Sequence, residues 1–420
     1  MDFVKQFYQN IDGLISSFNN NFPPHIAVGV SGGADSMCLA HLLNMWAKDK
    51  QIKITALIVN HNLRAEAKCE AELVQKRLNE LGIENFILTN DSKKPNTGIQ
   101  NYARQVRYEL MWNWCIDNNV KCLSTAHHYD DLLETIGIRL EKSSKSFGLA
   151  GINALQNLAN GFLIRPLLHF TKEQLIQYCE QNNICYVNDP SNKNEDFSRV
   201  RIRNKISKDT NYKQELIDIH NKNLPIRQDI EKSVIRLQKK YCMQMTGGFV
   251  KIDLKLLDEK EQDVFYTIRQ VIMWVRGDFT PPRTEKLNNL VTKLLKPKFS
   301  GATLNGCCIK ILQKNIWVYM ELKHIEQDVC LSKINIKNPY MDRYYLVKPN
   351  NRNLTITTLR NNNDINLDNI YFPKSILNSV ICVYEGKKLI YTMLDKGINN
   401  HNLEIIDNKW NLFYTCPFIY

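Results

Sequence analysis

The sequence has no pair of cysteines separated by two residues, and no apolar run long enough to cross a bilayer. Its 12 cysteines follow no metal-binding template. The N-terminal segment is amphipathic, because Asp2, Lys5 and Asp12 interrupt it, and so it lacks the apolar core of a signal peptide. We therefore expect a cytoplasmic protein with reduced cysteines and no membrane partner.

Two common nucleotide-binding signatures are also missing. The segment from Ser31 to Ser36 (SGGADS) has neither the lysine of a GxxxxGK[ST] loop nor the GxGxxG spacing of dinucleotide-binding folds. These absences argue against P-loop kinases and dinucleotide-dependent dehydrogenases. There is no internal repeat of about 20 to 50 residues either, so solenoids and propellers are not expected.

The length and the charge are more informative. A chain of 420 residues predicts two or three domains. The formal net charge of +12 favours a polyanionic partner such as nucleic acid. Basic residues concentrate in one segment, RVRIRNKISK, where Arg199, Arg201 and Arg203 are the candidate nucleic-acid-binding residues; the alternative is a solvated helix face.

Short β-rich runs alternate with helical patterns after residue 25, which is typical of a parallel α/β sheet. The expected strands are residues 25–30, 54–60, 85–89 and 121–126. Thr171 and Gln174 form a capping box that predicts the start of a further helix. We expect three domains: an α/β domain (1–208), a mostly helical or mixed domain (209–335) and a small β-rich domain (345–420).

The segment SGGADS directly follows the first expected strand and precedes a helix, which is where an α/β fold binds phosphate. Gly32 and Gly33 would allow a sharp turn and a close approach to an anion, and Ser31 and Ser36 carry hydroxyl donors. The helix end adds only about half a positive charge, so a divalent cation must neutralise most of the phosphate charge. Asp35 is therefore a candidate Mg²⁺ ligand, with helix capping as the alternative. The phosphate-binding candidates are Ser31, Gly32, Gly33, Ala34, Asp35 and Ser36.

The segments that follow parallel strands meet at one edge of the sheet. After the second strand comes NHNLR (60–64), and after the fourth comes HHYDDLLET (127–135). Asp131 and Glu134 are three residues apart, so they share a helix face, and carboxylates at this edge suit Mg²⁺. The alternatives are a zinc site formed by His127, His128 and Asp131, or helix capping by Asp130 and Asp131.

A third segment carries candidate phosphate ligands. In NYARQVRYELMW, Arg104 and Arg107 lie three residues apart on a predicted helix beside aromatic residues. Guanidinium groups hold phosphate oxygens well. The alternative is a pair of surface arginines on an amphipathic helix.

Together these residues resemble the PP-loop, or N-type, ATP pyrophosphatases, and within them the tRNA(Ile)-lysidine synthetase family. The resemblance rests on the ordered motifs SGGADS (31–36), NHNLR (60–64), NYARQVRY (101–108), TAHHYDDLLET (125–135), GLAGI (148–152), RPLL (165–168) and NDPSN (188–192), followed by RVRIR (199–203). The first motif marks the superfamily, and TAHHYDDLLET with NDPSN selects the family. The chain departs from the family's Gly-rich pattern between Glu141 and Ser146, and its C-terminal region lacks expected aromatic and arginine landmarks.

The resemblance implies an ATP-dependent carbon–nitrogen ligase. Such an enzyme adenylates the C2 carbonyl of the wobble cytidine in tRNA(Ile) with a CAU anticodon, and L-lysine then displaces AMP. By position, SGGADS would bind pyrophosphate, Asp35 and Asp131 would hold Mg²⁺, Arg104 would steady the phosphates, and Glu134 would orient the amine or the base.

Two rival functions remain open at this stage: another PP-loop tRNA-modifying enzyme, such as a thiolase, and a non-catalytic RNA-binding relative. The missing CxxC pair argues against a thiolase, and the intact acidic motifs argue against loss of catalysis. A homodimer is neither indicated nor excluded by the sequence.

Overall fold

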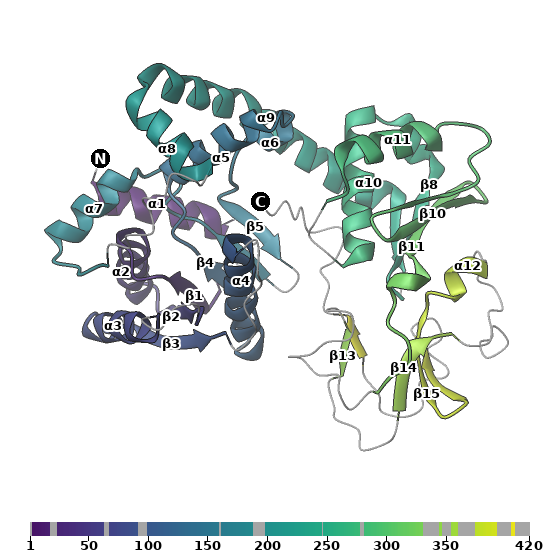
Figure 1. Ribbon diagram of the computed structural model, residues 1–420, viewed down its shortest axis with the longest axis horizontal. Helices are drawn as coiled ribbons and strands as arrows, with labels where there is room; N and C mark the ends of the chain where they lie inside the picture. Colours follow the sequence, from purple (N-terminus) through teal and green to yellow (C-terminus); the bar gives the residue numbers. More distant parts are fainter. Residues whose placement is uncertain are drawn as a thin grey trace. The chain divides into compact units, whose positions relative to one another are not determined.

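The computed structural model describes residues 2–16, 23–62, 67–90, 99–158, 161–187, 198–245, 247–277, 281–330, 344–346, 354–359, 374–392 and 405–407. The chain divides into two compact units, Met1–Gln228 and Asp229–Ile419 (Figure 1). The boundary falls within the long helix α9 (Thr210–Tyr241). Among the described helices, none combines the length and the apolar character needed to cross a membrane.

The first unit is built on a six-stranded sheet with the order β3-β2-β1-β4-β6-β5. All neighbours are parallel except β5 and β6. The strands are β1 (His25–Val30), β2 (Lys53–Asn60), β3 (Glu84–Thr89), β4 (Cys122–Ser124), β5 (Leu155–Leu158) and β6 (Gly161–Ile164). The chain leaves β1 towards β2 on one side and later returns to β4 on the other, so the strand order reverses at β1 and β4. This reversal is where open α/β sheets bind ligands, and the parallel α/β fold expected from the sequence is confirmed.

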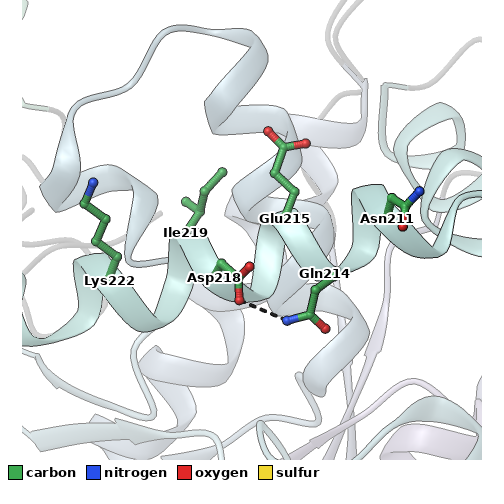
Figure 2. Close-up of a pocket in the computed structure, with 6 residues that line it drawn as sticks. All are labelled: Asn211, Gln214, Glu215, Asp218, Ile219 and Lys222. Carbon is green, nitrogen blue, oxygen red and sulfur yellow. Dashed lines mark hydrogen bonds between the residues drawn. The ribbon is translucent and has the colours of Figure 1, made fainter.

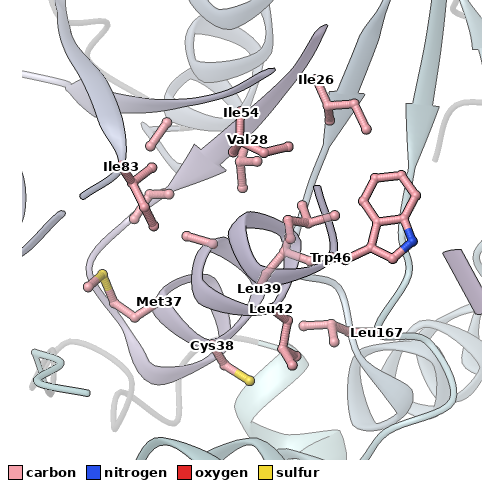
Figure 3. Packing of buried hydrophobic residues seen from close by; sticks show 14 of the residues in the cluster. Ile26, Val28, Met37, Cys38, Leu39, Leu42, Trp46, Ile54, Ile83 and Leu167 are labelled. Atoms are coloured by element: carbon pink, nitrogen blue, oxygen red, sulfur yellow. The ribbon is translucent and has the colours of Figure 1, made fainter. Parts of the chain in front are cut away.

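Successive buried residues of β1 point to opposite faces of this sheet, and helices cover both faces. Ile26, Val28 and Val30 pack against one helical layer, whose central helix contributes Leu39 and Trp46 (Figure 3). That layer contains α1 (Phe3–Ser16), α2 (Ala34–Lys48), α3 (Ala67–Glu80) and α7 (Lys172–Gln181). Burial of each apolar side chain of this size stabilises the fold by about 2 kcal/mol. The packing of this layer therefore holds the end of β1 in place.

The opposite face of β1 is covered by α4 (Ile99–Asp117), which approaches very closely. Ala27 packs in the same cluster as Met111 and Cys115 of this helix. A Cβ atom at Gly29 would lie 2.7 Å from Met111 Sδ, so a larger residue there would require the Met111 side chain to move. The last residues of β1 are thus held from both sides.

A second group of helices extends the domain beyond β4. These helices are α5 (Tyr129–Glu141), α6 (Ser146–Leu149) and α8 (Ser198–Lys208), together with the start of α9. Leu133 and Ile136 of α5 share a core cluster with Ile202 of α8 and Leu216 of α9. This cluster sets α8 directly against α5.

Three arginines hold the loop that follows α6 by its backbone carbonyl groups. Arg139 Nη1 donates to the carbonyl oxygens of Gly148 at 2.6 Å and Gly151 at 3.1 Å. Arg227 Nη1 donates to the same Gly151 oxygen at 2.7 Å, and Arg165 Nη1 donates to Asn153 O at 2.7 Å. The end of α5, where the sequence departs from the family pattern, is therefore firmly connected to α9 and to the end of β6.

The second unit contains antiparallel sheets and helices. Its five-stranded sheet has the order β7 (Cys242–Met245), β8 (Phe249–Asp253), β11 (Asn315–Met320), β10 (Cys307–Leu312) and β9 (Ala302–Leu304). Helices α10 (Glu261–Arg276) and α11 (Thr284–Leu294) and the short helices η2 (Leu254–Asp258) and η3 (Leu322–His324) accompany this sheet. The mixed middle region predicted from the sequence is confirmed.

The remaining described elements form the small β-rich region that the sequence predicted. A four-stranded sheet has the order β12 (Val329–Cys330), β14 (Leu354–Thr358), β15 (Ile381–Glu385) and β16 (Lys388–Thr392). A separate pair joins β13 (Tyr344–Leu346) and β17 (Ile405–Asp407), and α12 (Lys374–Leu377) is a single turn. Trp317 of β11 and Tyr384 of β15 share one hydrophobic cluster, so the two larger sheets pack through a common core.

Candidate active site

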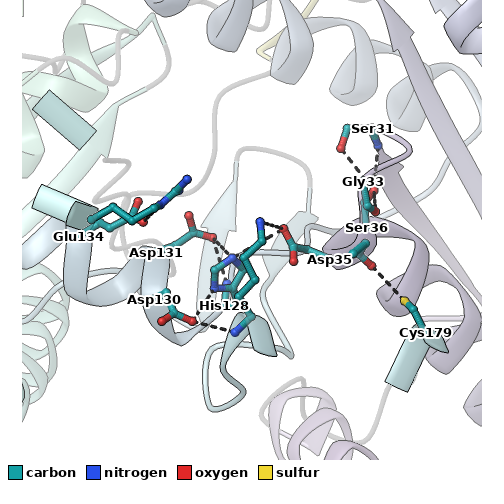
Figure 4. A network of polar contacts seen from close by, with 12 residues as sticks. Ser31, Gly33, Asp35, Ser36, His128, Asp130, Asp131, Glu134 and Cys179 are labelled. Atoms are coloured by element: carbon teal, nitrogen blue, oxygen red, sulfur yellow. Dashed lines mark hydrogen bonds and ion pairs between the residues drawn. The ribbon is translucent and has the colours of Figure 1, made fainter. Parts of the chain in front are cut away.

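The loop after β1 is closed by its own serine side chains. Ser31 N donates to Ser36 Oγ at 3.1 Å, and Ser36 Oγ donates to the carbonyl oxygen of Gly33 at 3.0 Å (Figure 4). Gly32 has a φ of +86°, and a Cβ there would overlap Val74 Cγ2, so glycine is required. Gly33 has a negative φ, and nothing lies within 3.9 Å of the position its Cβ would take. The backbone at Gly33 is thus open to a ligand.

Asp35 does not cap the helix that follows the loop. Gly33 is the N-cap residue of α2, and no side chain bonds to the free N–H groups there. Instead, Asp35 Oδ2 lies 3.4 Å from Lys172 Nζ and 3.7 Å from His128 Nε2. The other oxygen, Oδ1, is buried without a hydrogen-bond partner in the described structure. A buried acceptor without a donor suits a cation.

His128 joins carboxylates from the ends of two neighbouring strands. Its Nε2 lies 3.5 Å from Asp131 Oδ2, in addition to the contact with Asp35, and its Nδ1 lies 3.4 Å from Asp130 Oδ2 (Figure 4). Burial opposes the charge on the ring, but these three carboxylates raise the pKa of His128 above its ordinary value. The loop after β1 and the helix after β4 therefore meet at one acidic cluster, as the strand positions predict.

The donor set fits Mg²⁺ better than zinc. Mg²⁺ prefers carboxylate oxygens and keeps some of its water, so Asp35 and Asp131, with the buried unpaired Oδ1, are suitable ligands. His127 hydrogen-bonds Thr125 Oγ1 at 3.0 Å, and burial lowers its pKa well below the ordinary value. Within the described ranges, no group of three or more His, Cys, Asp or Glu side chains is arranged to hold a metal, so the choice between the two ions rests on the donor types alone.

Asp131 also takes part in helix capping. Its Oδ2 accepts a hydrogen bond from the backbone N–H of His128 at 3.2 Å, at the start of α5. Burial opposes ionisation of Asp131, but the two adjacent histidines and Arg199 lower its pKa. The carboxylate is thus oriented by the backbone at the start of α5, and the lowered pKa keeps it ionised.

Glu134 is buried one turn further along α5, where it faces the arginines of α8. Its side chain is 1% exposed, and Oε1 accepts from Arg203 Nε at 2.6 Å. Arg199 Nε lies 3.9 Å from Oε2. Burial raises the pKa of Glu134 in spite of these arginines. Arg201, on another side of α8, pairs with Glu141 Oε2 at 2.6 Å.

The arginine-rich segment is therefore not simply a solvated helix face. Each of the three arginines that the sequence assigned to tRNA binding lies against a carboxylate of α5. Arg201 remains 63% exposed at its side chain, and Arg199 and Arg203 remain partly exposed. A phosphate contact would thus draw these guanidinium groups from partners that they already have.

The remaining candidates lie on α4 and at the end of β2. The Arg104 guanidinium lies 5.3 Å from the centre of the Tyr108 ring. Arg107 Nη2 lies 3.4 Å from His61 Nε2, which connects α4 to the end of β2. Asn60 Oδ1 accepts from Asn62 N at 2.9 Å in a tight turn. Leu63 and Arg64 of the NHNLR motif and the NDPSN motif (188–192) lie outside the described residues.

The sequence pattern did not indicate Lys172 or the role of Asp130 at this site. Asp130 Oδ2 accepts from the backbone N–H of Lys172 at 2.7 Å, which fixes the start of α7 to the start of α5. The capping box of Thr171 and Gln174, which the sequence did predict, is confirmed at the same place. The sequence feature that could have indicated Lys172 is its position in the segment that follows a strand. That strand is β6, which is not among the strands expected from the sequence.

Asp130 should contribute to the stability of this unit in a pH-dependent way. Burial opposes its charge, but His128 and the N–H of Lys172 lower its pKa from 3.8 to about 2. A carboxylate with a lowered pKa stabilises the fold above its unfolded pKa and loses this effect as the pH falls. Because Asp130 is partly exposed, solvent screens part of this effect. We expect Asp130→Ala to cost about 1 kcal/mol at pH 7, and the difference from the wild type to shrink between pH 4 and pH 2.

Urea unfolding at several pH values measures this effect. Asp49→Ala, at the far end of α2, is the control and should leave the pH dependence unchanged. An equal loss for Asp130→Ala at pH 7 and pH 3 would show that the carboxylate charge is not involved.

A separate cavity of about 410 Å³ lies along α9 (Figure 2). Its lining residues are Asn211, Gln214, Glu215, Asp218, Ile219 and Lys222. None of these residues lies at the end of a strand. Gln214 Nε2 donates a hydrogen bond to Asp218 Oδ1 at 2.9 Å. This cavity is therefore not part of the acidic cluster.

The structure also brings together two cysteines that the sequence keeps far apart. Cys179 Sγ of α7 donates to the carbonyl oxygen of Ala34 at 3.5 Å, one helical turn before Cys38. Both side chains are fully buried in the core beneath the loop. Buried thiols of this kind do not provide the exposed cysteines that sulfur transfer uses.

The strand order, the glycine loop after β1 and the acidic helix after β4 together define a PP-loop domain, and the family model for the PP-loop domain matches residues 4–210. A tRNA(Ile)-lysidine synthase from Rickettsia akari (strain Hartford) is 32% identical over 336 residues, covering 78% of this chain and 77% of that protein. A tRNA(Ile)-lysidine synthase from Rickettsia bellii (strain RML369-C) is 29% identical over 97% of this chain and 96% of its own length. The chain belongs to the tRNA(Ile)-lysidine synthase family.

Among solved structures, the chain is similar to the U34-tRNA thiolase NcsA from Methanococcus maripaludis with its [4Fe-4S] cluster. It is 18% identical, with a TM-score of 0.46, and the match covers 54% of this chain and 80% of that chain.

Proposed function

We propose that this protein joins free L-lysine to C2 of the wobble cytidine of tRNA(Ile) with a CAU anticodon, using ATP and Mg²⁺ and releasing AMP and pyrophosphate. The observation that carries the proposal is the acidic cluster in which His128 joins Asp35 to Asp131 beside the glycine loop. Family membership supports the choice of tRNA and lysine as substrates.

The reaction needs activation because a carbonyl oxygen is a poor leaving group, whereas AMP departs readily once the oxygen is adenylated. The open backbone at Gly33 and the start of α2 would receive the phosphates of ATP. Asp35 and Asp131 would hold Mg²⁺, which supplies positive charge to neutralise the pyrophosphate. Arg104, on α4, would hold phosphate oxygens.

Glu134 has a suitable environment for handling the lysine amine. Its carboxylate is buried and its pKa is raised by burial, so it can accept a proton more readily than an exposed glutamate. Arg203 fixes its orientation through the 2.6 Å contact. Glu134 would thus orient the amine and take up the proton as the new carbon–nitrogen bond forms, and Arg199, Arg201 and Arg203 would contact tRNA phosphates at the same edge.

An assay with purified components tests this proposal. We expect incubation with ATP, Mg²⁺, labelled lysine and a tRNA(Ile) transcript with a CAU anticodon to incorporate lysine and to release AMP and pyrophosphate. A transcript with uridine at the wobble position is the control and should accept none. Release of AMP without lysine incorporation, with sulfur incorporated when a sulfide donor is added, would favour the thiolase. Binding of tRNA with no release of AMP would favour a non-catalytic RNA-binding protein.

A further inference from the structure

Lys172 occupies an unusual position beside the glycine loop. Its backbone N–H donates a hydrogen bond to Asp130 Oδ2 at 2.7 Å, and its Nζ lies 3.4 Å from Asp35 Oδ2. The backbone of Lys172 is thus fixed at the start of α7, while its side chain remains 43% exposed. A flexible side chain on a fixed base can move its charge without moving the helix.

The partner of this ammonium group is the carboxylate proposed to bind Mg²⁺. A divalent cation on Asp35 would repel the ammonium, since both are positive and would share one carboxylate. The phosphates of a nucleotide on the adjacent loop offer a new negative partner. Lysine is a common phosphate ligand in proteins, where it acts as a point charge.

We propose that Lys172 contacts the β- and γ-phosphates of ATP when Mg²⁺ is bound, and that in the absence of both it pairs with Asp35. This inference rests on the proposed ATP site and adds a phosphate-binding residue to it. The segment SGGADS itself contains no lysine. Lys172, which lies much later in the sequence, supplies a positive charge beside this loop.

His128 does not serve this purpose, although it also contacts Asp35. Its side chain is 4% exposed and lies between three carboxylates, two of them at the start of its own helix. A buried ring in such a position cannot turn towards a ligand without losing its contacts with those carboxylates. Of these two cations, Lys172 is therefore the one free to reach a phosphate.

The test compares Lys172→Met with the wild-type full-length protein in two binding measurements. In the first, α,β-methylene ATP, which cannot be cleaved between its α- and β-phosphates, and AMP are titrated by calorimetry in the presence of Mg²⁺. We expect affinity for the ATP analogue to fall about tenfold, because one charge-assisted contact is lost, and affinity for AMP to stay the same. A merely structural effect on the loop would weaken both ligands together.

The second measurement follows the rise in melting temperature caused by Mn²⁺ without nucleotide. We expect half-maximal stabilisation at about threefold lower Mn²⁺ in Lys172→Met, because the competing ammonium has been removed. Lys48→Met, at the far end of α2, is the matched control and should change neither measurement.

Unchanged affinity for the ATP analogue in Lys172→Met would overturn the inference, and so would an equal loss for AMP or an unchanged Mn²⁺ response. These failures differ from failure of the proposed function. If the wild-type protein binds the ATP analogue and transfers lysine to tRNA while Lys172→Met behaves like the wild type, only the role of Lys172 is wrong.

Discussion

Replacing Asp35 with alanine is expected to reduce lysine transfer by about a thousandfold, the equivalent of about 4 kcal/mol of transition-state stabilisation. The side chain leaves the loop backbone untouched, because Asp35 makes no capping bond to α2. What the substitution removes is a carboxylate with one buried, unpaired oxygen beside the phosphate site. Release of AMP, measured with saturating ATP and tRNA, reports the loss.

The binding of tRNA should be unaffected in the same variant, because its proposed contacts are the arginines of α8. A filter-binding titration of labelled tRNA against Asp35→Ala checks this. Asp49→Ala, on the same helix, is the control for both measurements. Normal AMP release from Asp35→Ala would remove the proposed metal role and, with it, the mechanism.

Replacing Arg203 with methionine is expected to have the largest effect on stability. Glu134 is almost fully buried, and Arg203 is its closest cationic partner, at 2.6 Å. Removing one partner of a buried ion pair leaves a charge without compensation, which costs about 3 to 5 kcal/mol in fully buried pairs. Since Arg203 is partly exposed and Arg199 remains nearby, we expect Arg203→Met to lower the free energy of unfolding by about 2 kcal/mol. Urea denaturation measures the change.

A double variant separates this structural role from the proposed catalytic one. Glu134→Gln removes the buried charge, so Arg203→Met should cost much less in that background. We expect the double variant to recover most of the lost stability but to transfer no lysine, because the proton acceptor is gone. Additive losses of stability would contradict the buried-charge explanation, and full lysine transfer by Glu134→Gln would contradict the catalytic one.

The sequence predicted the half of the site that depends on local pattern. An apolar run followed by two glycines marks the end of β1 and the loop, and the positions of Asp131 and Glu134 follow from helical spacing. The parallel order of strands then brings these segments together. Each of these signals is a local pattern of a few residues, so a single sequence is sufficient to detect it.

The sequence could not predict contacts that depend on the packing of distant elements. Arg199 and Arg203 contact Glu134 because α8 packs against α5, and no local sequence pattern indicates this packing. Lys172 was missed because β5 and β6 are four residues each, too short for a periodic pattern. His128 was considered only as a zinc ligand, because its three carboxylate contacts require Asp35 to arrive from another strand.

The close contact between Gly29 and α4 couples two positions that lie far apart in the sequence. A methyl group at position 29 would come within 2.7 Å of Met111 Sδ, so the flexible Met111 side chain, on the helix that also carries Arg104 and Arg107, would have to move. A substitution that enlarges residue 29 is therefore expected to be accompanied by a change at position 111.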